Sequence, residues 1–119
     1  MAWSFNSHTP VYLQIAARLR GEIIRGVYKP NEQIPPVRTL AVIAAVNPNT
    51  VQRALATLED EGIIYSQTTQ GRYVTDNEEI LASAKSRAVN ELIEDFLQKS
   101  KEFSVSKEEI IKMIEEAEI

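Results

Sequence analysis

The first half of the chain contains three stretches in which apolar residues recur every three or four positions, and each stretch begins at a proline. This spacing places apolar side chains on one face of an α-helix. Proline is favoured at the first helical position because its missing N–H costs nothing there. The pattern predicts one helix from Pro10 to a glycine stop at Gly26, a short helix from Pro36, and a third from Pro48 to Gly62.

Each predicted helix has one face that we expect to be buried. The core-facing positions are Tyr12, Ile15, Ala16, Leu19 and Ile23 in the first helix, Val37, Leu40, Ala41 and Ala44 in the second, and Val51, Ala54, Leu55 and Leu58 in the third. Thr9 and Asn47 precede two of the prolines, and their side-chain oxygens are expected to cap the helices. About three residues separate the second helix from the third, which is the spacing of a helix-turn-helix.

The hydrophobic period changes after the third helix. Two β-branched and aromatic runs, IIYSQ (63–67) and RYVT (72–75), flank the polar TTQG (68–71), and this layout predicts a two-stranded hairpin that forms a wing. The stretch VYKPNEQIP (27–35) contains turn residues and a final proline, which suits a short strand or an extended connection. The expected fold is α+β but mainly α: a winged helix-turn-helix.

Two further helices are expected after the hairpin. Asp76 with Glu79 predicts a capped helix of about 77–100, and Ser106 with Glu109 predicts a capped final helix. The long apolar stripe of the first cannot be covered by the small last helix, so a monomer would expose an apolar patch and we expect a homodimer. The residues expected to form the dimer interface are Leu81, Ala88, Leu92, Phe96, Ile110 and Ile114.

The net charge of -4 is unusual for a nucleic-acid binder until the chain is divided near Asp76. Residues 1–76 carry seven Lys/Arg against six Asp/Glu, a balance of +1, whereas residues 77–119 carry six against eleven, a balance of -5. A near-neutral first part still binds DNA if its basic residues cluster on one face. We assign residues 1–76 to a DNA-binding domain and residues 77–119 to a two-helix dimerisation segment.

The composition excludes several kinds of site. The chain has no cysteine and one histidine, His8, which rules out a disulfide framework, a multi-histidine metal site and a Ser/His/Asp relay. We therefore expect no enzyme, no bound metal and no cofactor. The N-terminus lacks a signal-peptide layout, and the longest apolar run, Leu40–Val46, is too short to span a bilayer. These features predict a soluble cytoplasmic protein without a membrane partner.

Three motifs in this order resemble the GntR family of bacterial transcription regulators. They are P-x-Y-x-Q-I-A, I-P-P-V-R-x-L-A, and N-P-N-T-V-x-R-A-L followed by L-E-x-E-G-x-I. The match covers residues 10–75, and the short tail of two helices resembles the YtrA-like subgroup. The resemblance implies a homodimeric regulator of a palindromic DNA operator, a repressor of a neighbouring operon such as one for an ABC transporter, relieved by a small effector.

The resemblance also implies which side chains contact double-stranded DNA. They are Arg38, Asn47, Asn49, Thr50, Gln52 and Gly71. Arg53 and Arg72 are added as DNA-contact candidates from their own positions on the third helix and the hairpin. Arg38 matches an arginine that meets a phosphate or a groove edge, and Gly71 matches a wing-tip glycine that lets the backbone approach the minor groove. Gln52 stands where many relatives carry arginine, and its amide suits adenine instead of guanine. The wing TTQG lacks the basic residues common in relatives.

Two other departures from the family concern turns. Ala45 and Asn31 both stand where relatives often carry glycine, and asparagine adopts a positive φ at lower cost than alanine. Trp3 and Phe5 either pack on the winged helix or lie in a pocket shared with a dimer partner.

The residues themselves leave alternatives open. Arg53 either reaches a phosphate or pairs with a nearby carboxylate. Arg72 and Tyr73 either contact DNA or are strand residues, with Tyr73 on the core and Arg72 in solvent. The rival function is a winged helix that binds a partner protein through its acidic tail. An enzyme would need a nucleophile with its base, a metal cluster or a phosphate-binding glycine loop, which the sequence lacks.

Overall fold

The structure is a computed structural model that describes residues 2–67 and 71–119. It contains two compact units, Met1–Lys85 and Ser86–Ile119. The first unit holds the winged helix-turn-helix, and the second unit holds the C-terminal helices.

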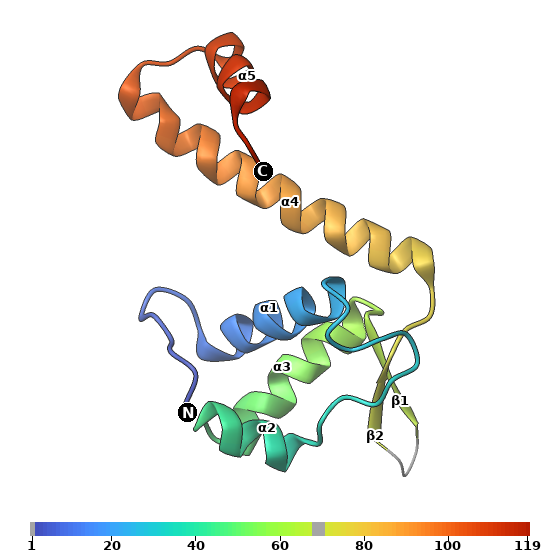
Figure 1. The fold of residues 1–119 in the computed structure, drawn as a ribbon. Coiled ribbons are helices and arrows are strands. Elements are labelled where there is room, and N and C mark those ends of the chain that lie inside the picture. The colour runs from blue at the N-terminus through green and yellow to red at the C-terminus, as the bar shows by residue number, and fades with distance from the viewer. Residues whose placement is uncertain (1, 68–70) are drawn as a thin grey trace. The chain divides into compact units, whose positions relative to one another are not determined.

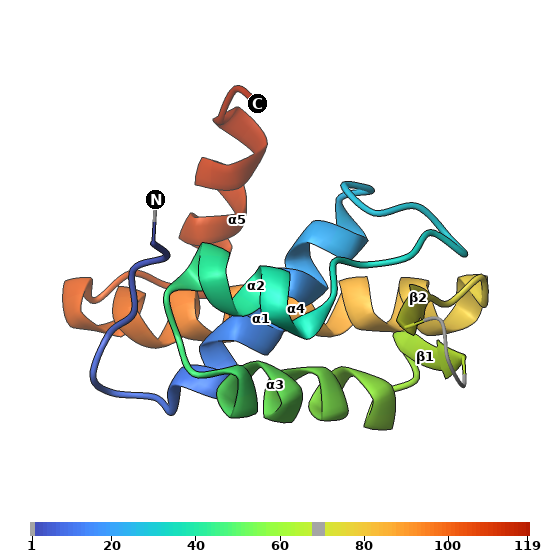
Figure 2. The same cartoon turned by 90° about the horizontal axis from the view of Figure 1, so that it is seen from below.

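The first unit is built around a central helix. Its elements are α1 (Val11–Ile24), α2 (Val37–Ala44), α3 (Pro48–Asp60), β1 (Ile64–Gln67) and β2 (Gly71–Val74). The central helix α3 packs against both α1 and α2, and β1 pairs with β2 as an antiparallel hairpin (Figure 1). Figure 2 shows α3 along one side of this unit, with the hairpin at its C-terminal end. This is the mainly helical winged helix-turn-helix predicted from the sequence.

The core of this unit lies where the three helices meet the hairpin. Of the predicted core positions, Ile15, Ala16, Leu19, Ile23, Leu40, Ala41, Ala44, Val51, Ala54, Leu55 and Leu58 are buried, and Tyr12 and Val37 are half-buried. Ile63, Ile64 and Val74 complete the core from the hairpin. Trp3 and Phe5 pack against it, so the first of their two interpretations is confirmed.

The starts of α1 and α2 differ from the prediction by one residue. Pro10 and Pro36 occupy the N-cap positions instead of the first helical positions, and neither helix has a side-chain cap. The expected cap by Thr9 is therefore wrong. Gln14 instead ties the segment before α1 to the helix, because its Nε2 donates to the carbonyl oxygens of Thr9 at 2.7 Å and Asn6 at 3.0 Å. These bonds do not cap the free N–H groups of α1.

The turn after α2 contains a residue in the left-handed region. Ala45 has φ 59° and ψ 49°, a conformation in which its Cβ crowds the following carbonyl oxygen. Asn31 is also left-handed, with φ 65°. Both residues thus adopt a conformation that glycine takes without cost, and Ala45 carries the larger strain.

We expect Ala45→Gly to raise the free energy of unfolding by about 1 kcal/mol, because glycine adopts this conformation without a Cβ clash. Urea denaturation followed by circular dichroism measures the change. Ala17→Gly, at an exposed position within α1, is the matched control and should lower stability by about 0.5–1 kcal/mol. A destabilised Ala45→Gly variant would contradict strain at this turn.

The segment between α1 and α2 joins the hairpin as an extended connection. The N–H of Ile34 donates to the carbonyl oxygen of Arg72 at 3.0 Å, and Gln33 forms an isolated antiparallel bridge with Tyr73. The strand β2 therefore has a backbone partner on each side. On the hairpin itself, the directly paired Tyr65 and Tyr73 stack with ring centroids 5.8 Å apart.

The cap of α4 (Glu78–Ser100) comes from Asn77. Its Oδ1 accepts from the backbone N–H groups two and three residues later, at 3.0 and 3.2 Å. Asp76 accepts instead from Nδ2 of Asn31 at 3.3 Å. The predicted Asp76 cap is wrong by one residue, because the side chain directly before the helix is the one that reaches its free N–H groups.

The first two turns of α4 belong to the first unit. Ala84 is buried there, and Ile80 and Leu81 pack against the core. The functional boundary expected after residue 76 stays a prediction.

The second unit contains the rest of α4, a 3-10 turn (Lys101–Phe103) and α5 (Lys107–Glu116). Ser106 and Glu109 form the predicted capping box at the start of α5, and Ile110 is buried. The large apolar residues that remain exposed in this unit include Val89, Leu92, Ile93, Phe96, Phe103, Ile111, Met113 and Ile114. Within the described ranges, no helix is long and apolar enough to cross a membrane.

Candidate nucleic-acid interface

One face of α3 is turned away from the core. Asn49, Gln52, Arg53 and Ala56 are exposed, whereas the four apolar residues of its opposite stripe are at most 1 % exposed. Positions three, four and seven residues apart lie above one another on a helix, so these side chains share one surface over two turns. A helix that presents such a surface after a short turn has the geometry of a DNA recognition helix.

The N-terminus of α3 is capped by the residue that precedes it. Oδ1 of Asn47 accepts from the backbone N–H of Asn49 at 2.8 Å, which confirms the predicted cap and leaves the amide nitrogen of Asn47 as a donor. The uncapped N–H groups at a helix start favour anions. Thr50, in the same turn, is half-buried.

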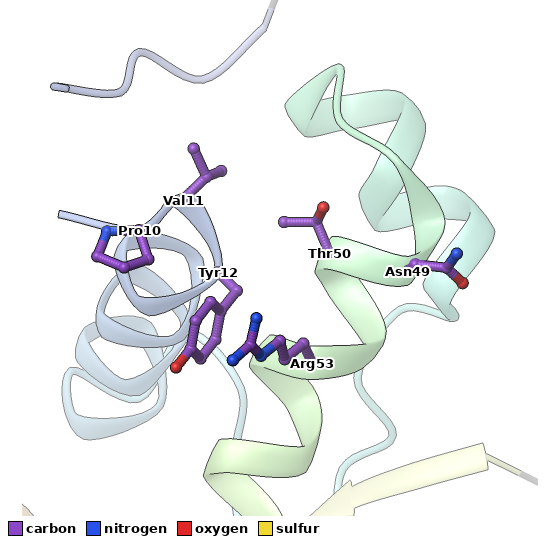
Figure 3. Close-up of a pocket in the computed structure, with 6 residues that line it drawn as sticks. All are labelled: Pro10, Val11, Tyr12, Asn49, Thr50 and Arg53. Atoms are coloured by element: carbon purple, nitrogen blue, oxygen red, sulfur yellow. The ribbon is translucent and has the colours of Figure 1, made fainter.

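Arg53 lies over an aromatic ring. Its guanidinium carbon is 4.1 Å from the ring centroid of Tyr12, the tyrosine of the first motif (Figure 3). The sequence left a phosphate and a carboxylate as partners for Arg53, and in the described part of the chain no carboxylate pairs with it. The cation–π contact orients the guanidinium without neutralising its charge.

An open pocket of about 370 Å³ lies between α1 and the start of α3. It is lined by Pro10, Val11, Tyr12, Asn49, Thr50 and Arg53. Figure 3 shows Tyr12 and Arg53 side by side, Thr50 directed to the α1 side, and Asn49 pointing away from the Tyr12 ring. The pocket therefore gathers hydroxyl and guanidinium donors beside a helix N-terminus, a combination suited to a phosphate group.

Arg72 connects the wing to α3. From β2, its Nε donates to Oε1 of Glu59 at 2.6 Å and its Nη2 donates to Oε1 of Gln52 at 2.8 Å. Ser66 of β1 donates to the same Glu59 oxygen at 2.8 Å. The interpretation of Arg72 as a strand residue in solvent is wrong, because its side chain is only 25 % exposed and has two partners on α3.

The carboxylate of Glu59 is stabilised in this cluster. Its partial burial by itself favours the neutral form, but hydrogen bonds from Arg72 and Ser66 and the charge of Arg72 outweigh burial and lower its pKa. Glu59, near the end of α3, thus forms an ion pair with Arg72 of β2, and Ser66 of β1 donates to the same carboxylate oxygen.

We expect the contribution of Glu59 to stability to disappear in acid. A folded-state pKa below the unfolded one means that the contribution is complete above about pH 4.5 and is lost as pH falls through the lower, folded value. The free energies of unfolding of the wild type and of Glu59→Gln, measured between about pH 3 and pH 7, should therefore converge at the acidic end. A difference that does not change with pH would contradict the role of the ionised carboxylate.

Two further expected contact residues, Arg38 and Gly71, are not members of this cluster. Arg38 is exposed in the first turn of α2 and, within the described ranges, makes no hydrogen bond or ion pair. Gly71 begins β2 with φ +100°, and a Cβ there would lie 2.7 Å from Nε2 of Gln33. The flexible end of Gln33 can move aside, so the positive φ is what favours glycine at this position. The other residues of the expected uncharged wing tip, 68–70, lie outside the described residues.

The sequence did not single out Tyr12, Glu59 or Ser66 as site residues. A usable signal existed for Glu59, which lies seven residues after Gln52 and so on the same face of α3. Tyr12 carried none, since its spacing fits the core stripe as well. The described residues contain no group of three or more His, Asp or Glu side chains placed to hold a metal ion.

Comparisons with known proteins agree with this geometry. Residues 11–74 match the family described as bacterial regulatory proteins, gntR family. The chain is similar to the HTH-type transcriptional regulator YhcF of Bacillus subtilis (strain 168), with 34 % identity over 110 residues that cover 92 % of this chain and 91 % of YhcF. It is also similar to the HTH-type transcriptional repressor YtrA of the same strain, with 42 % identity over 71 residues, 60 % of this chain and 55 % of YtrA.

A solved structure shares the fold along nearly the whole chain. The GntR family transcriptional regulator from Listeria monocytogenes superimposes with a TM-score of 0.86 and 32 % identity, covering 96 % of this chain and 100 % of that one. The similarity thus includes the C-terminal helices as well as the winged helix. The chain therefore belongs to the GntR family of bacterial regulatory proteins, and is a DNA-binding transcriptional regulator with YtrA among its homologues.

Proposed function

We propose that the protein is a repressor that binds a palindromic operator as a homodimer and inserts α3 into the major groove. The observation that carries this proposal is the exposed polar face of α3, with Asn49, Gln52 and Arg53 on a helix whose other face is the core. A major groove admits one α-helix, and base edges are read by side chains on its outer face.

The contacts divide into two kinds. Arg38, Asn47, Arg53 and the N-terminus of α3 bind phosphates and position the protein. Asn49, Thr50 and Gln52 carry the base discrimination. In the wing, Gly71 lets the backbone approach the minor groove. Affinity then depends on phosphates and on salt, and sequence preference depends on a few amides and one hydroxyl.

The exposed apolar residues of the second unit support pairing with a second copy. Leu92 is 70 % exposed, Phe96 51 % and Ile114 63 %, and Leu92 and Phe96 lie one turn apart on α4. Large exposed apolar surface is typical of protein–protein interfaces. A two-fold axis brings the same patch of each protomer together, and it gives the dimer two recognition helices for two half-sites. Ala88 adds to this stripe, whereas Leu81 packs on the core of the first unit and Ile110 is already buried.

Repression is supported by the similarity to YtrA, which is named a transcriptional repressor. A neighbouring operon as the target, for instance one for an ABC transporter, stays a prediction. Regulation by a small effector stays a prediction.

Selection of binding sites from random duplex DNA by the full chain, followed by fluorescence anisotropy, tests the proposal. We expect a palindrome with half-site centres about 10 bp or a multiple apart, and affinity that falls steeply with salt. A folded protein that remains indifferent to DNA sequence at low salt would contradict the proposal and favour a winged helix used for protein binding.

We expect Arg38→Ala to weaken binding to all DNA sequences alike, because a phosphate contact carries no base information. The slope of log affinity against log salt should fall by about one unit, the change for one lost phosphate contact. Arg25→Ala removes the same charge from an exposed residue at the end of α1 and is the control. Loss confined to particular operator bases would instead make Arg38 a base-reading residue.

A further inference from the structure

We propose that Arg72 is a positioning residue that sets the base preference of Gln52, so that Gln52 favours guanine. The inference rests on the proposed function and names a specificity determinant within it. Arg72 is held from two sides, by Glu59 at 2.6 Å and by Gln52 at 2.8 Å, and both partners lie on the exposed face of α3.

Chemistry fixes which way the Gln52 amide faces. A guanidinium offers N–H donors only, so the group of Gln52 that meets Arg72 must be the amide oxygen. The amide nitrogen, with its two donor hydrogens, therefore points away from Arg72. Because Gln52 is exposed on α3, that nitrogen is available to a base edge.

This orientation changes what the glutamine reads. A glutamine recognises adenine by donating to N7 and accepting from the N6 amino group at the same time. Here the oxygen is engaged by a charged donor, which is a strong hydrogen bond. With its oxygen held by Arg72, Gln52 presents the two hydrogens of its amide nitrogen, and the base with two neighbouring major-groove acceptors, O6 and N7, is guanine. The lone Gln52 side chain, by contrast, predicts adenine.

Glu59 makes the arrangement rigid. Its carboxylate holds Nε of Arg72, and Ser66 donates to the same oxygen, so two strands and α3 fix the guanidinium. A free arginine on a wing would lose side-chain entropy each time it met Gln52, whereas this one is ordered before DNA arrives.

The test is the affinity of each variant for operators that carry each of the four bases at each position. For the wild type we expect guanine at the position read by Gln52. In Arg72→Met the preference there should move toward adenine by about tenfold, the scale of one base-specific pair of hydrogen bonds. Gln52→Ala should abolish the preference at that position, and adding Arg72→Met to it should change the preference no further.

Arg20→Met is the matched control. Arg20 makes a two-bond ion pair with Glu61 at 2.8 and 2.6 Å, and its side chain is 25 % exposed, as that of Arg72 is. The control should lose stability and keep the base preference. If Arg72→Met does not fold, Arg72→Lys serves, because an ammonium keeps the charge and cannot reproduce the fork between two partners.

Two results would overturn the inference. One is a uniform loss of affinity in Arg72→Met with an unchanged preference, which would leave Arg72 as a phosphate contact or a support of the wing. The other is adenine preferred by the wild type at the position that Gln52→Ala identifies. If the wild type binds no operator at all, the proposed function itself has failed, and this inference with it.

Discussion

Leu92→Glu should convert the proposed dimer to a monomer and lower operator affinity by about 10²–10⁴-fold, the gain that linking two binding modules provides. Leu92 is 70 % exposed in the single chain, so the substitution leaves the fold of the protomer intact and places a charge in the expected interface. Burying an unpaired carboxylate there is costly. Analytical ultracentrifugation measures the assembly, and fluorescence anisotropy measures the affinity.

Asn90→Glu is the control for this experiment. It adds the same charge at an exposed polar position two residues away, on nearly the opposite face of α4. The control should remain dimeric. A Leu92→Glu protein that still sediments as a dimer would show that the apolar stripe of the second unit is not the interface.

Leu55→Ala should lower the free energy of unfolding by about 2–5 kcal/mol, the range for removing a buried leucine from a packed core. Leu55 is 1 % exposed on the inner face of α3. Since small domains have only about 5–15 kcal/mol of stability in total, the variant should melt well below the wild type. Chemical denaturation followed by far-ultraviolet circular dichroism gives the value.

Leu13→Ala is the control for the loss of stability expected in Leu55→Ala. Leu13 lies on α1 and is 37 % exposed, so its truncation should cost much less. Folded Leu55→Ala protein should retain the base preference of the wild type, since no base-reading side chain is changed. Equal losses for the two leucines would contradict the placement of the core beneath α3.

The helices of the winged unit were predictable because the apolar residues that recur at helical spacing are the same residues that form the core. Leu40, Ala44 and Leu58, for example, lie on the inner stripes of α2 and α3 and are buried. The helix starts were less predictable. Thr9 and Asp76 are good capping types, yet α1 has no side-chain cap and Asn77 caps α4 in place of Asp76. The geometry of the last residues before a helix decides which side chain reaches its N–H groups.

The candidate site was predictable in part. Motif resemblance placed Asn49, Gln52 and Arg53 on one helix, and the structure exposes all three. The partners of these side chains were not readable, because Tyr12 is 41 positions from Arg53 and Arg72 is 20 positions from Gln52 along the chain. Such contacts arise only when α1, α3 and the hairpin are packed together.

The sequence by itself determined the order of the helices and the hairpin, the inner and outer faces of α3 and the concentration of acidic residues in the tail, since these depend on local spacing and composition. Only the tertiary structure decided that Arg72 is tied to Glu59 and Gln52, and that Arg53 rests on Tyr12. The physical reason is distance along the chain. Periodicity reports which face of an element is buried, whereas hydrogen bonds and cation–π contacts depend on atoms that folding brings within a few ångströms.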